Sequence, residues 1–161
     1  MRLRTLWIPI ILSSLAGCGE DGTELEKGPF LRVDRPRLGF GLEFNSGTLI
    51  QTTGFNSLAL ENGGDAPLVI NKISEEGDSA NVFSVQLPPD ITSSEPIELQ
   101  SLKRTFVEVR FRPLNKQKYT GKLIIESNSA KNPRQEVELV GCGLRNTEDT
   151  LLEECKDLFL E

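Results

Sequence analysis

The clearest structural signal in this sequence is the segment Thr105-Phe106-Val107-Glu108-Val109-Arg110-Phe111-Arg112-Pro113. Apolar residues occupy alternate positions on one side, Val107, Val109 and Phe111, and the positions between them are mostly charged. A period of two is typical of a β-strand with one face in a core and the other in water. Pro113 has no backbone N–H to donate to a sheet, so we expect the strand to end there.

Shorter runs of the same kind lie on both sides of this segment. We predict further strands over residues 37–44, 56–61, 67–73, 83–87, 97–102, 122–126 and 136–139. Turn residues separate them, as in Asn62-Gly63-Gly64, where Asn and Gly tolerate a positive φ. The step from Ile70 to Ile73 breaks the period and predicts a β-bulge. Seven or eight short strands without intervening helices predict an all-β, immunoglobulin-like β-sandwich.

After Asn146 the apolar period changes to that of a helix. One stripe is formed by Leu151, Leu152, Cys155, Leu158 and Phe159. Asn146 or Thr147 could cap the start of such a helix. We therefore predict a short amphipathic C-terminal α-helix over residues 146–161. A short helix is marginal in water, so the stripe must rest either on its own sandwich or on another chain.

The N-terminus has the features of an export signal. Arg2 and Arg4 precede an apolar run over residues 6–12, which is far shorter than the ~20 residues that span a bilayer. The run closes with Leu15-Ala16-Gly17-Cys18, which resembles the lipobox of bacterial lipoproteins. The resemblance implies cleavage before Cys18, a diacylglycerol on its sulfur and an acyl chain on its new amine. The alternative is an ordinary signal peptide with an unrelated cysteine.

These features divide the chain into four parts. We expect a lipoprotein signal peptide over residues 1–17, a lipidated Cys18 with a flexible acidic tether over 18–29, the sandwich over 30–145, and the helix over 146–161. Gly19 stands where enteric lipoproteins retained in the inner membrane carry Asp. The resemblance thus implies a lipid-anchored protein of the cell envelope, at the outer membrane, on its periplasmic face or surface.

Composition excludes several classes of function. The chain of 161 residues has 18 basic and 24 acidic residues, and losing Arg2 and Arg4 with the signal peptide lowers its formal charge from −6 to −8. Such an acidic protein is not expected to bind nucleic acid. The absence of His removes His-based acid–base catalysis and most zinc and copper sites. No nucleophile elbow, phosphate loop or paired Cys-x-x-Cys is present. We predict no catalytic residue, no metal and no cofactor.

Two cysteines remain once Cys18 is acylated, Cys142 and Cys155. An even pair in an exported protein favours a disulfide. The alternative is two separate thiols, one near a strand end and one on a helix face.

Charge is unevenly distributed along the sequence. Between positions 103 and 122 a single acid, Glu108, stands among seven bases: Lys103, Arg104, Arg110, Arg112, Lys116, Lys118 and Lys122. One interpretation is a basic face for anionic headgroups or an acidic partner. The other is a set of solvated strand residues, partly neutralised by the acidic C-terminal segment of the same molecule.

The run Glu75-Glu76-Gly77-Asp78-Ser79 offers carboxylate oxygens of the kind that Ca²⁺ prefers. It lacks the spacing of a complete calcium-binding loop, and we interpret it as a solvated loop.

Several segments together resemble a known type of domain. They are Leu60-Glu61-Asn62-Gly63-Gly64 followed by Pro67-Leu68-Val69-Ile70, then residues 107–113, 119–128 and 137–143. In this order they resemble ASH/hydin-like immunoglobulin-type domains, called choice-of-anchor D domains in bacteria and related to major sperm protein and PapD-like sandwiches. The resemblance covers residues 33–144. It implies a non-catalytic scaffold or binding module, and it transfers no ligand site.

The function expected from the sequence is that of a non-catalytic envelope lipoprotein, a binding or scaffolding module with a protein partner in the envelope. The alternative is an accessory subunit of an envelope enzyme or secretion assembly, docked through the C-terminal helix. The single copy of the domain argues against a filament built from a tandem array.

Overall fold

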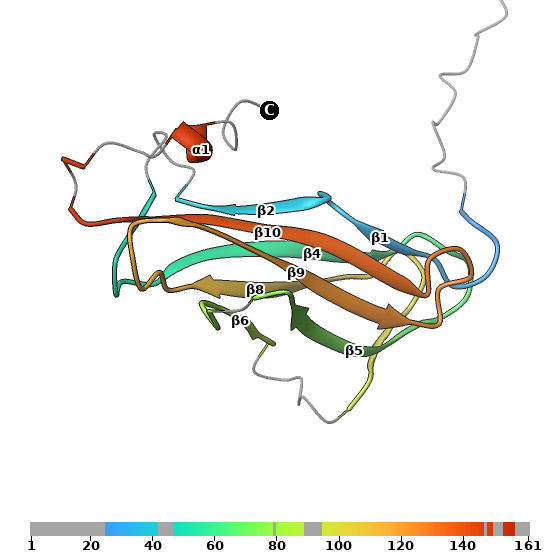
Figure 1. The fold of residues 1–161 in the computed structure, drawn as a ribbon. Helices are drawn as coiled ribbons and strands as arrows, with labels where there is room; N and C mark the ends of the chain where they lie inside the picture. The colour runs from blue at the N-terminus through green and yellow to red at the C-terminus, as the bar shows by residue number, and fades with distance from the viewer. Residues whose placement is uncertain are drawn as a thin grey trace, which may run out of the picture.

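The computed structural model describes residues 25–41, 47–78, 80–88, 95–146, 148–149 and 153–156. These residues form two stacked β-sheets (Figure 1). The four-stranded sheet has the order β1 (Leu31–Val33), β4 (Gly54–Asn62), β8 (Arg104–Phe111) and β6 (Phe83–Gln86). All of its neighbouring strands are antiparallel.

The second sheet has the order β2 (Arg37–Phe40), β10 (Arg134–Leu144), β9 (Lys118–Ser127), β5 (Leu68–Glu76) and β7 (Ile97–Leu99). β3 (Thr48–Leu49) also pairs with β10. β2 and β3 run parallel to β10, and the other pairs are antiparallel. The all-β sandwich is thus confirmed. β1 and β3 are additions to the eight predicted strands.

The core lies between the two sheets, as the alternating pattern of β8 predicts. Val107, Val109 and Phe111 are fully buried, while Phe106 is 55% exposed. The ring of Phe111 packs against Phe40, whose centroid is 5.4 Å away, and against Phe83 and Tyr119 at 5.0 and 5.6 Å. Rings at these separations attract each other beyond the area that they bury. This aromatic cluster joins strands of both sheets.

The predicted bulge in β5 is confirmed. Ile70 pairs with Ser127 on β9, and the register shifts before Lys72 pairs with Glu126.

The predicted turn after Asn62 is also present, but its glycines have a different role. Neither Gly63 nor Gly64 has a positive φ. A Cβ on Gly64 would lie 1.9 Å from the carbonyl oxygen of Gly28, and one on Gly63 would lie 2.3 Å from Nε of Arg32. These glycines are needed because another backbone and a side chain approach closely, and not for their dihedral freedom.

Part of the predicted tether belongs to the domain. The backbone N–H of Glu26 donates to the Gly63 carbonyl at 3.1 Å, and that of Asp65 donates to the Glu26 carbonyl at 3.0 Å. Gly28 N–H donates to the Asp65 carboxylate at 2.6 Å. Residues 25–29 dock because the 63–65 turn presents backbone groups that need partners. Residues 18–24 lie outside the described residues, and the tether prediction now concerns only these.

The predicted helix over residues 146–161 is not supported. The structure describes one helical turn, α1 (Glu153–Lys156). Upstream of it, Glu148 N–H donates to the Asn146 side chain at 3.0 Å, and Arg145 N–H donates to the Asp149 carboxylate at 3.1 Å. Both side chains thus bind backbone groups of a turn. Asn and Asp favour turns over helices through hydrogen bonds of this kind. Leu151, Leu152, Leu158 and Phe159 of the predicted stripe lie outside the described residues.

Candidate functional site

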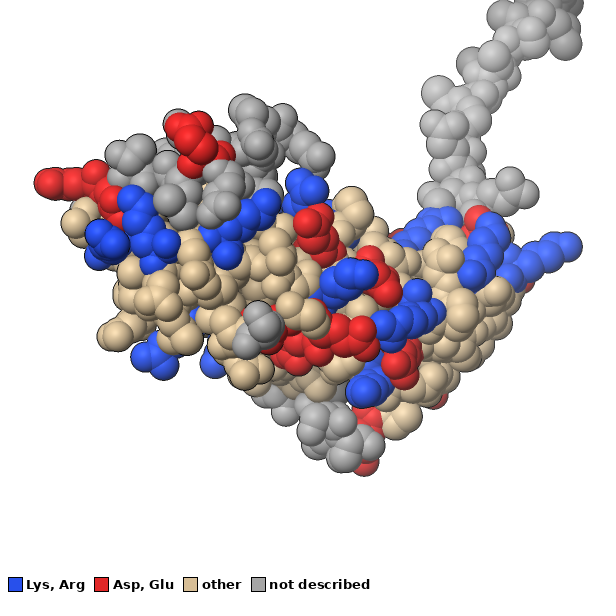
Figure 2. All heavy atoms as spheres, viewed as in Figure 1, with Lys and Arg blue, Asp and Glu red and all other residues tan. Residues whose placement is uncertain are grey.

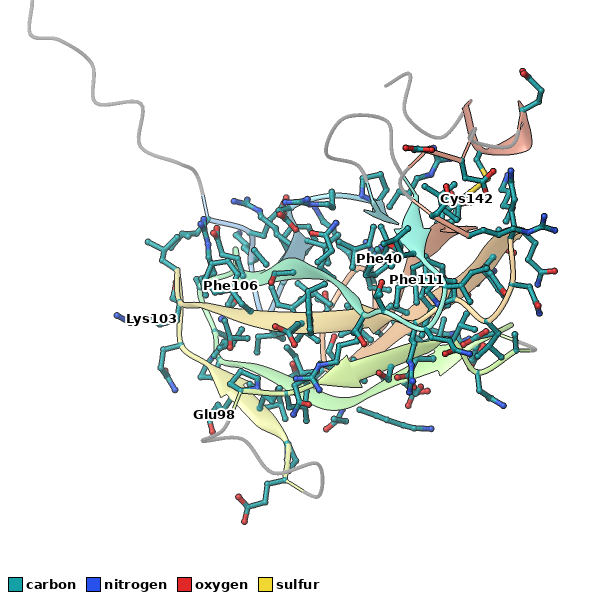
Figure 3. The ribbon with its side chains drawn as sticks, turned by 90° about the vertical axis from the view of Figure 1, so that its left-hand side faces the viewer. Phe40, Glu98, Lys103, Phe106, Phe111 and Cys142 are labelled. Carbon is teal, nitrogen blue, oxygen red and sulfur yellow. A yellow bond between two sulfur atoms is a disulfide. The ribbon has the colours of Figure 1, made fainter. Side chains whose placement is uncertain are left out.

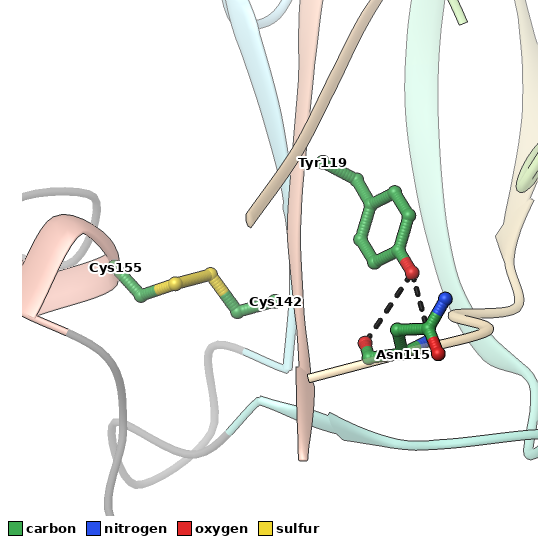
Figure 4. The surroundings of a disulfide bond; sticks show 4 residues. All are labelled: Asn115, Tyr119, Cys142 and Cys155. Atoms are coloured by element: carbon green, nitrogen blue, oxygen red, sulfur yellow. Dashed lines mark hydrogen bonds between the residues drawn. A yellow bond between two sulfur atoms is a disulfide. The ribbon is translucent and has the colours of Figure 1, made fainter. Parts of the chain in front are cut away.

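A disulfide joins Cys142 on β10 to Cys155 in α1, which confirms the predicted pairing (Figure 4). The two Cα atoms are 6.4 Å apart, within the range that the bond allows. Both cysteines are almost fully buried. The bond therefore holds α1 against the end of the second sheet.

Two glycines flank Cys142 because other groups press against the strand there. A Cβ on Gly141 would lie 2.5 Å from the Phe111 ring, and one on Gly143 would lie 2.1 Å from the Asn115 carbonyl oxygen. Asn115 is held in turn by Tyr119, whose hydroxyl accepts the Asn115 N–H at 2.8 Å (Figure 4). The Gly141-Cys142-Gly143 motif is thus a packing motif.

An ion pair adds to this end of the molecule. The ammonium of Lys116 lies 2.5 Å from the Asp149 carboxylate, and the two side chains are only 20% and 17% exposed. The hydrogen bond from Lys116 and a second one from the Arg145 N–H lower the pKa of Asp149 below its usual value. The pair connects the β8–β9 loop to the chain that leads to α1.

The seven bases predicted as a basic face do not share one surface. Arg104 and Arg110 lie on β8, Lys118 and Lys122 on β9 of the other sheet. Lys103 lies in the turn before β8, and Arg112 and Lys116 lie beyond its far end.

Most of these bases already have partners. Arg104 pairs with Glu61 at 2.7 Å, Arg110 with Glu108 at 3.0 Å and Lys122 with Glu136 at 2.7 Å. Arg112 donates to the Gln51 carbonyl at 3.3 Å. These bases are close in the sequence but do not form one basic face. Alternate residues point to opposite sides of a strand, and β8 and β9 belong to different sheets.

Two carboxylates of the acidic run 75–79 bind the outer edge of the four-stranded sheet. Glu75 accepts the N–H of Val85 at 2.5 Å, and Asp78 accepts that of Phe83 at 2.8 Å. Both donors belong to β6, which ends the order of the four-stranded sheet. An edge strand with free N–H groups invites pairing with other chains, and these carboxylates occupy two of them. Ser79 lies outside the described residues.

Two further observations concern the described part of the chain only. It contains no group of three His, Cys, Asp or Glu residues that could hold a metal ion. It contains no helix with the length and apolar character that crossing a membrane requires. The lipobox residues Leu15, Ala16, Gly17 and Cys18 lie outside it.

The outer face of the second sheet is covered by paired charges. Arg134 lies 2.8 Å from Glu76 and 3.6 Å from both Glu126 and Glu136. The Lys122 hydrogen bond lowers the pKa of Glu136, and the Glu76 hydrogen bond raises that of Arg134. Figure 2 shows acidic and basic side chains interleaved in this way across the surface in view. Such a surface is well solvated and offers little apolar area to a partner.

The outer face of the four-stranded sheet is different, because it exposes two phenylalanines. Phe55 on β4 is 59% exposed and Phe106 on β8 is 55% exposed. In Figure 3 the exposed Phe106 lies toward the Lys103 end, and the buried Phe40 and Phe111 lie toward the Cys142 end. We call this surface the aromatic face and define it by Phe55, Ser57, Ala59, Glu61, Arg104, Phe106, Glu108 and Arg110.

The strand pairing sets the layout of the aromatic face. Phe106 lies opposite Ala59, and Phe55 lies opposite Arg110, with the pair of Ser57 and Glu108 between them. The Arg110 guanidinium lies over the Phe55 ring, 5.5 Å from its centroid. A cation in this position is attracted by the ring and holds it in place.

Phe106 separates two hollows on the aromatic face. One, of about 560 Å³, lies toward Gln86, Pro88 and Arg110. The other, of about 310 Å³, lies toward Arg32, Asp34 and Glu61. An exposed aromatic ring between two hollows, with its neighbouring arginines held by ion pairs, is the kind of anchor that protein interfaces favour.

The period of two in the sequence places Phe106 on the outer side of its strand, but it assigns this residue no role. The signal was available, because Phe106 is an apolar residue where the period of two predicts a polar one. Phe55 carried no such signal, since only the pairing of β4 with β8 places it beside Arg110.

The two packed sheets form an immunoglobulin-like β-sandwich. No family model and no curated protein sequence matches the chain. Among solved structures, it is similar to PapD-like domain 7 of human CEP192, an ASH/PapD-like domain, with 16% identity and a TM-score of 0.53 over 85% of this chain and 98% of that domain.

A second similar structure is a protein of unknown function from Porphyromonas gingivalis. The identity is 15% and the TM-score 0.54, over 73% of this chain and 47% of that one. At such identities the likeness shows the fold, which agrees with the ASH/hydin-like resemblance of the sequence.

Proposed function

We propose that this protein is a non-catalytic binding module of the bacterial cell envelope, anchored by acyl chains on Cys18 and holding a protein partner on the aromatic face. The lipobox-like Leu15-Ala16-Gly17-Cys18 supports the anchor. Because Gly19 follows the cysteine, we infer retention at the outer membrane.

The observation that carries the binding function is the contrast between the two outer faces. One is a network of ion pairs around Arg134, and the other exposes Phe55 and Phe106. Exposed aromatic rings on an ordered sheet lose apolar contact with water when a partner covers them, and their side chains have little conformational freedom to lose. The aromatic face is therefore the surface on which we place the partner.

The alternative is an accessory subunit that docks through its C-terminal segment. The disulfide favours the self-contained module, because Cys155 is fully buried and α1 is bonded to β10 of the same chain. A segment held in this way has less surface left for another chain.

The anchor is tested by fractionation of cells that express the protein and its Cys18→Ser variant. We expect the unaltered protein to sediment with membranes in its processed form. The variant should be soluble or remain unprocessed. A processed Cys18→Ser protein that still sediments with membranes would refute the lipobox interpretation.

The binding surface is tested by Phe106→Ser, with Lys122→Ser as a matched control on the outer face of the other sheet. Both side chains are exposed, so neither change should disturb the core. We expect crosslinked co-purification of the partner to be lost in Phe106→Ser and retained in Lys122→Ser. Equal recovery with both variants would contradict the assignment of the face.

A further inference from the structure

One end of the sandwich presents an apolar side chain to solvent at a strained position. Leu102, in the turn between β7 and β8, is 57% exposed and has a φ of 60°. A branched residue with positive φ is uncommon and needs support from its surroundings. The Leu102 N–H donates to the Asn62 carbonyl at 2.9 Å, and Asn62 is fully buried. The fold therefore holds this leucine outward.

Basic side chains come from the segments that meet at this end, where the Asn62 N–H donates to the Lys103 carbonyl and the Gly63 N–H to that of Phe30. Lys131 and Arg32 both lie over the ring of Phe30, 5.2 and 5.6 Å from its centroid. Lys27 and Lys103 are exposed. Figure 3 places Lys103 at this end and Cys142 at the other.

Two acids at the same end are paired with basic side chains. Glu26 pairs with Lys131 at 2.7 Å, and Glu61 pairs with Arg104 at 2.7 Å. Asp65 accepts the Gly28 N–H at 2.6 Å. Within the described part of the chain, Lys27 and Lys103 have no acidic partner, and the exposed Asp65 and Glu98 bond only to neutral groups.

The polypeptide that leads to the anchor enters at this end as well. Glu26 bonds to the Gly63 carbonyl, one residue from the Asn62 that supports Leu102. Leu25 is the first described residue, seven positions after Cys18. An extended chain spans about 3.5 Å per residue, so this end can lie no more than about 25 Å from an anchored Cys18.

From these observations we propose that this end is a membrane-contact surface, on which Leu102 enters the lipid interface while Lys27 and Lys103 bind anionic headgroups. The inference rests on the acylation of Cys18 proposed above. Tethering raises the local concentration of the surface at the bilayer, so a few weak contacts suffice. In this orientation one end of the sandwich faces the membrane, and the aromatic face remains accessible to a protein partner.

Tryptophan fluorescence tests this orientation, because the only tryptophan of the sequence, Trp7, lies within the signal peptide. Leu102→Trp places a reporter at the proposed contact. Leu114→Trp is the matched control, since Leu114 is 52% exposed and follows the opposite end of β8. The eight residues of β8 span roughly 25 Å at about 3.3 Å each.

The processed chain, residues 18–161, is coupled through Cys18 to a maleimide lipid in vesicles that contain brominated acyl chains and an anionic phospholipid. Cys142 and Cys155 are bonded to each other and do not compete. Denaturation midpoints identify any variant that has lost its fold. The coupling supplies the anchor, so the result does not depend on acylation in the cell, which the Cys18→Ser fractionation tests separately.

We expect the tryptophan of Leu102→Trp to shift its emission to shorter wavelength and to be quenched, and that of Leu114→Trp to show neither change. Adding Lys27→Glu and Lys103→Glu, or using neutral vesicles, should weaken the quenching at position 102. Equal quenching on neutral and anionic vesicles would overturn the role of the lysines. An unquenched reporter at position 102 would overturn the proposal and leave the acidic segment 19–24 of the same chain as the partner of these bases.

Discussion

Cys142, near the end of β10, is covalently bonded to Cys155 in α1, and this bond closes a loop of thirteen positions. A closed loop of about 15 residues is worth about 3 kcal/mol in the chain-entropy account of disulfides. We expect Cys155→Ser to lower the free energy of unfolding by about this amount in a urea titration. Reduction of the unaltered protein should give the same loss. A midpoint that neither change moves would show that the bond is not formed in the protein.

Asn62 supports the turn that follows β4 from a fully buried position. Its side-chain amide donates to the carbonyls of Ala66 and Leu99 at 2.8 and 2.9 Å, and its oxygen accepts the Gly64 N–H at 3.0 Å. Asn62→Ala leaves these groups without partners, so we expect a loss on the order of 2–3 kcal/mol in denaturant unfolding.

Asn128→Ala is the control for this measurement. The Asn128 side chain also binds backbone, accepting the Val69 N–H at 2.8 Å, but it is exposed and water can replace it. We expect a loss of about 1 kcal/mol or less. Equal losses at the two positions would contradict the role assigned to burial.

Gly141 is predicted to be intolerant of a side chain. An added Cβ would lie 2.5 Å from the buried Phe111 ring, which sits in the aromatic cluster and cannot move away. We expect Gly141→Ala to cost about 1–3 kcal/mol by overpacking, measured by thermal or chemical unfolding. Gly121→Ala is the matched strand glycine, with its nearest contact at 3.3 Å, and should cost less. The reverse order would refute the packing account of the Gly141-Cys142-Gly143 motif.

The ion pair of Lys116 and Asp149 predicts a contribution to stability that depends on pH. The pKa of Asp149 is lowered from its ordinary 3.8 by the Lys116 hydrogen bond above all. A lowered carboxyl pKa stabilises the fold above the unfolded-state value, and the contribution is lost as the pH falls through the folded-state value. We expect Asp149→Asn to be less stable than the unaltered protein at pH 7 and equal to it in strong acid. A difference that persists unchanged in acid would exclude this pair as its source.

Much of the sandwich was predictable because its strands carry a local signal. The alternation of Val107, Val109 and Phe111 is repeated in enough neighbours to indicate an all-β fold. β1 and β3 have three and two residues, too few to display a period, and they exist through pairing with β4 and β10.

The failed predictions concern features that depend on partners distant in the sequence. Residues 25–29 were predicted to belong to a flexible tether because the segment is polar, but backbone groups of the 63–65 turn bind them. The apolar stripe predicted a helix from Asn146, where side chains instead bind the backbone of a turn.

The candidate site shows the same limit. Seven bases close in sequence became a dispersed set once β8 and β9 were assigned to different sheets. The aromatic face follows from the register that sets Phe106 opposite Ala59 and Phe55 opposite Arg110. That register depends on contacts about fifty residues apart, and no local pattern encodes it.

The central claim, an anchored module with its partner on the aromatic face, is tested most directly by site-specific photocrosslinking in intact cells. A photoreactive residue replaces Phe106 or, as the control on the charged face of the second sheet, Lys122. We predict one discrete crosslinked species from position 106, none from position 122, and loss of the species in the Cys18→Ser background. The same adducts from both positions, or an adduct at position 106 that survives Cys18→Ser unchanged, would contradict the account.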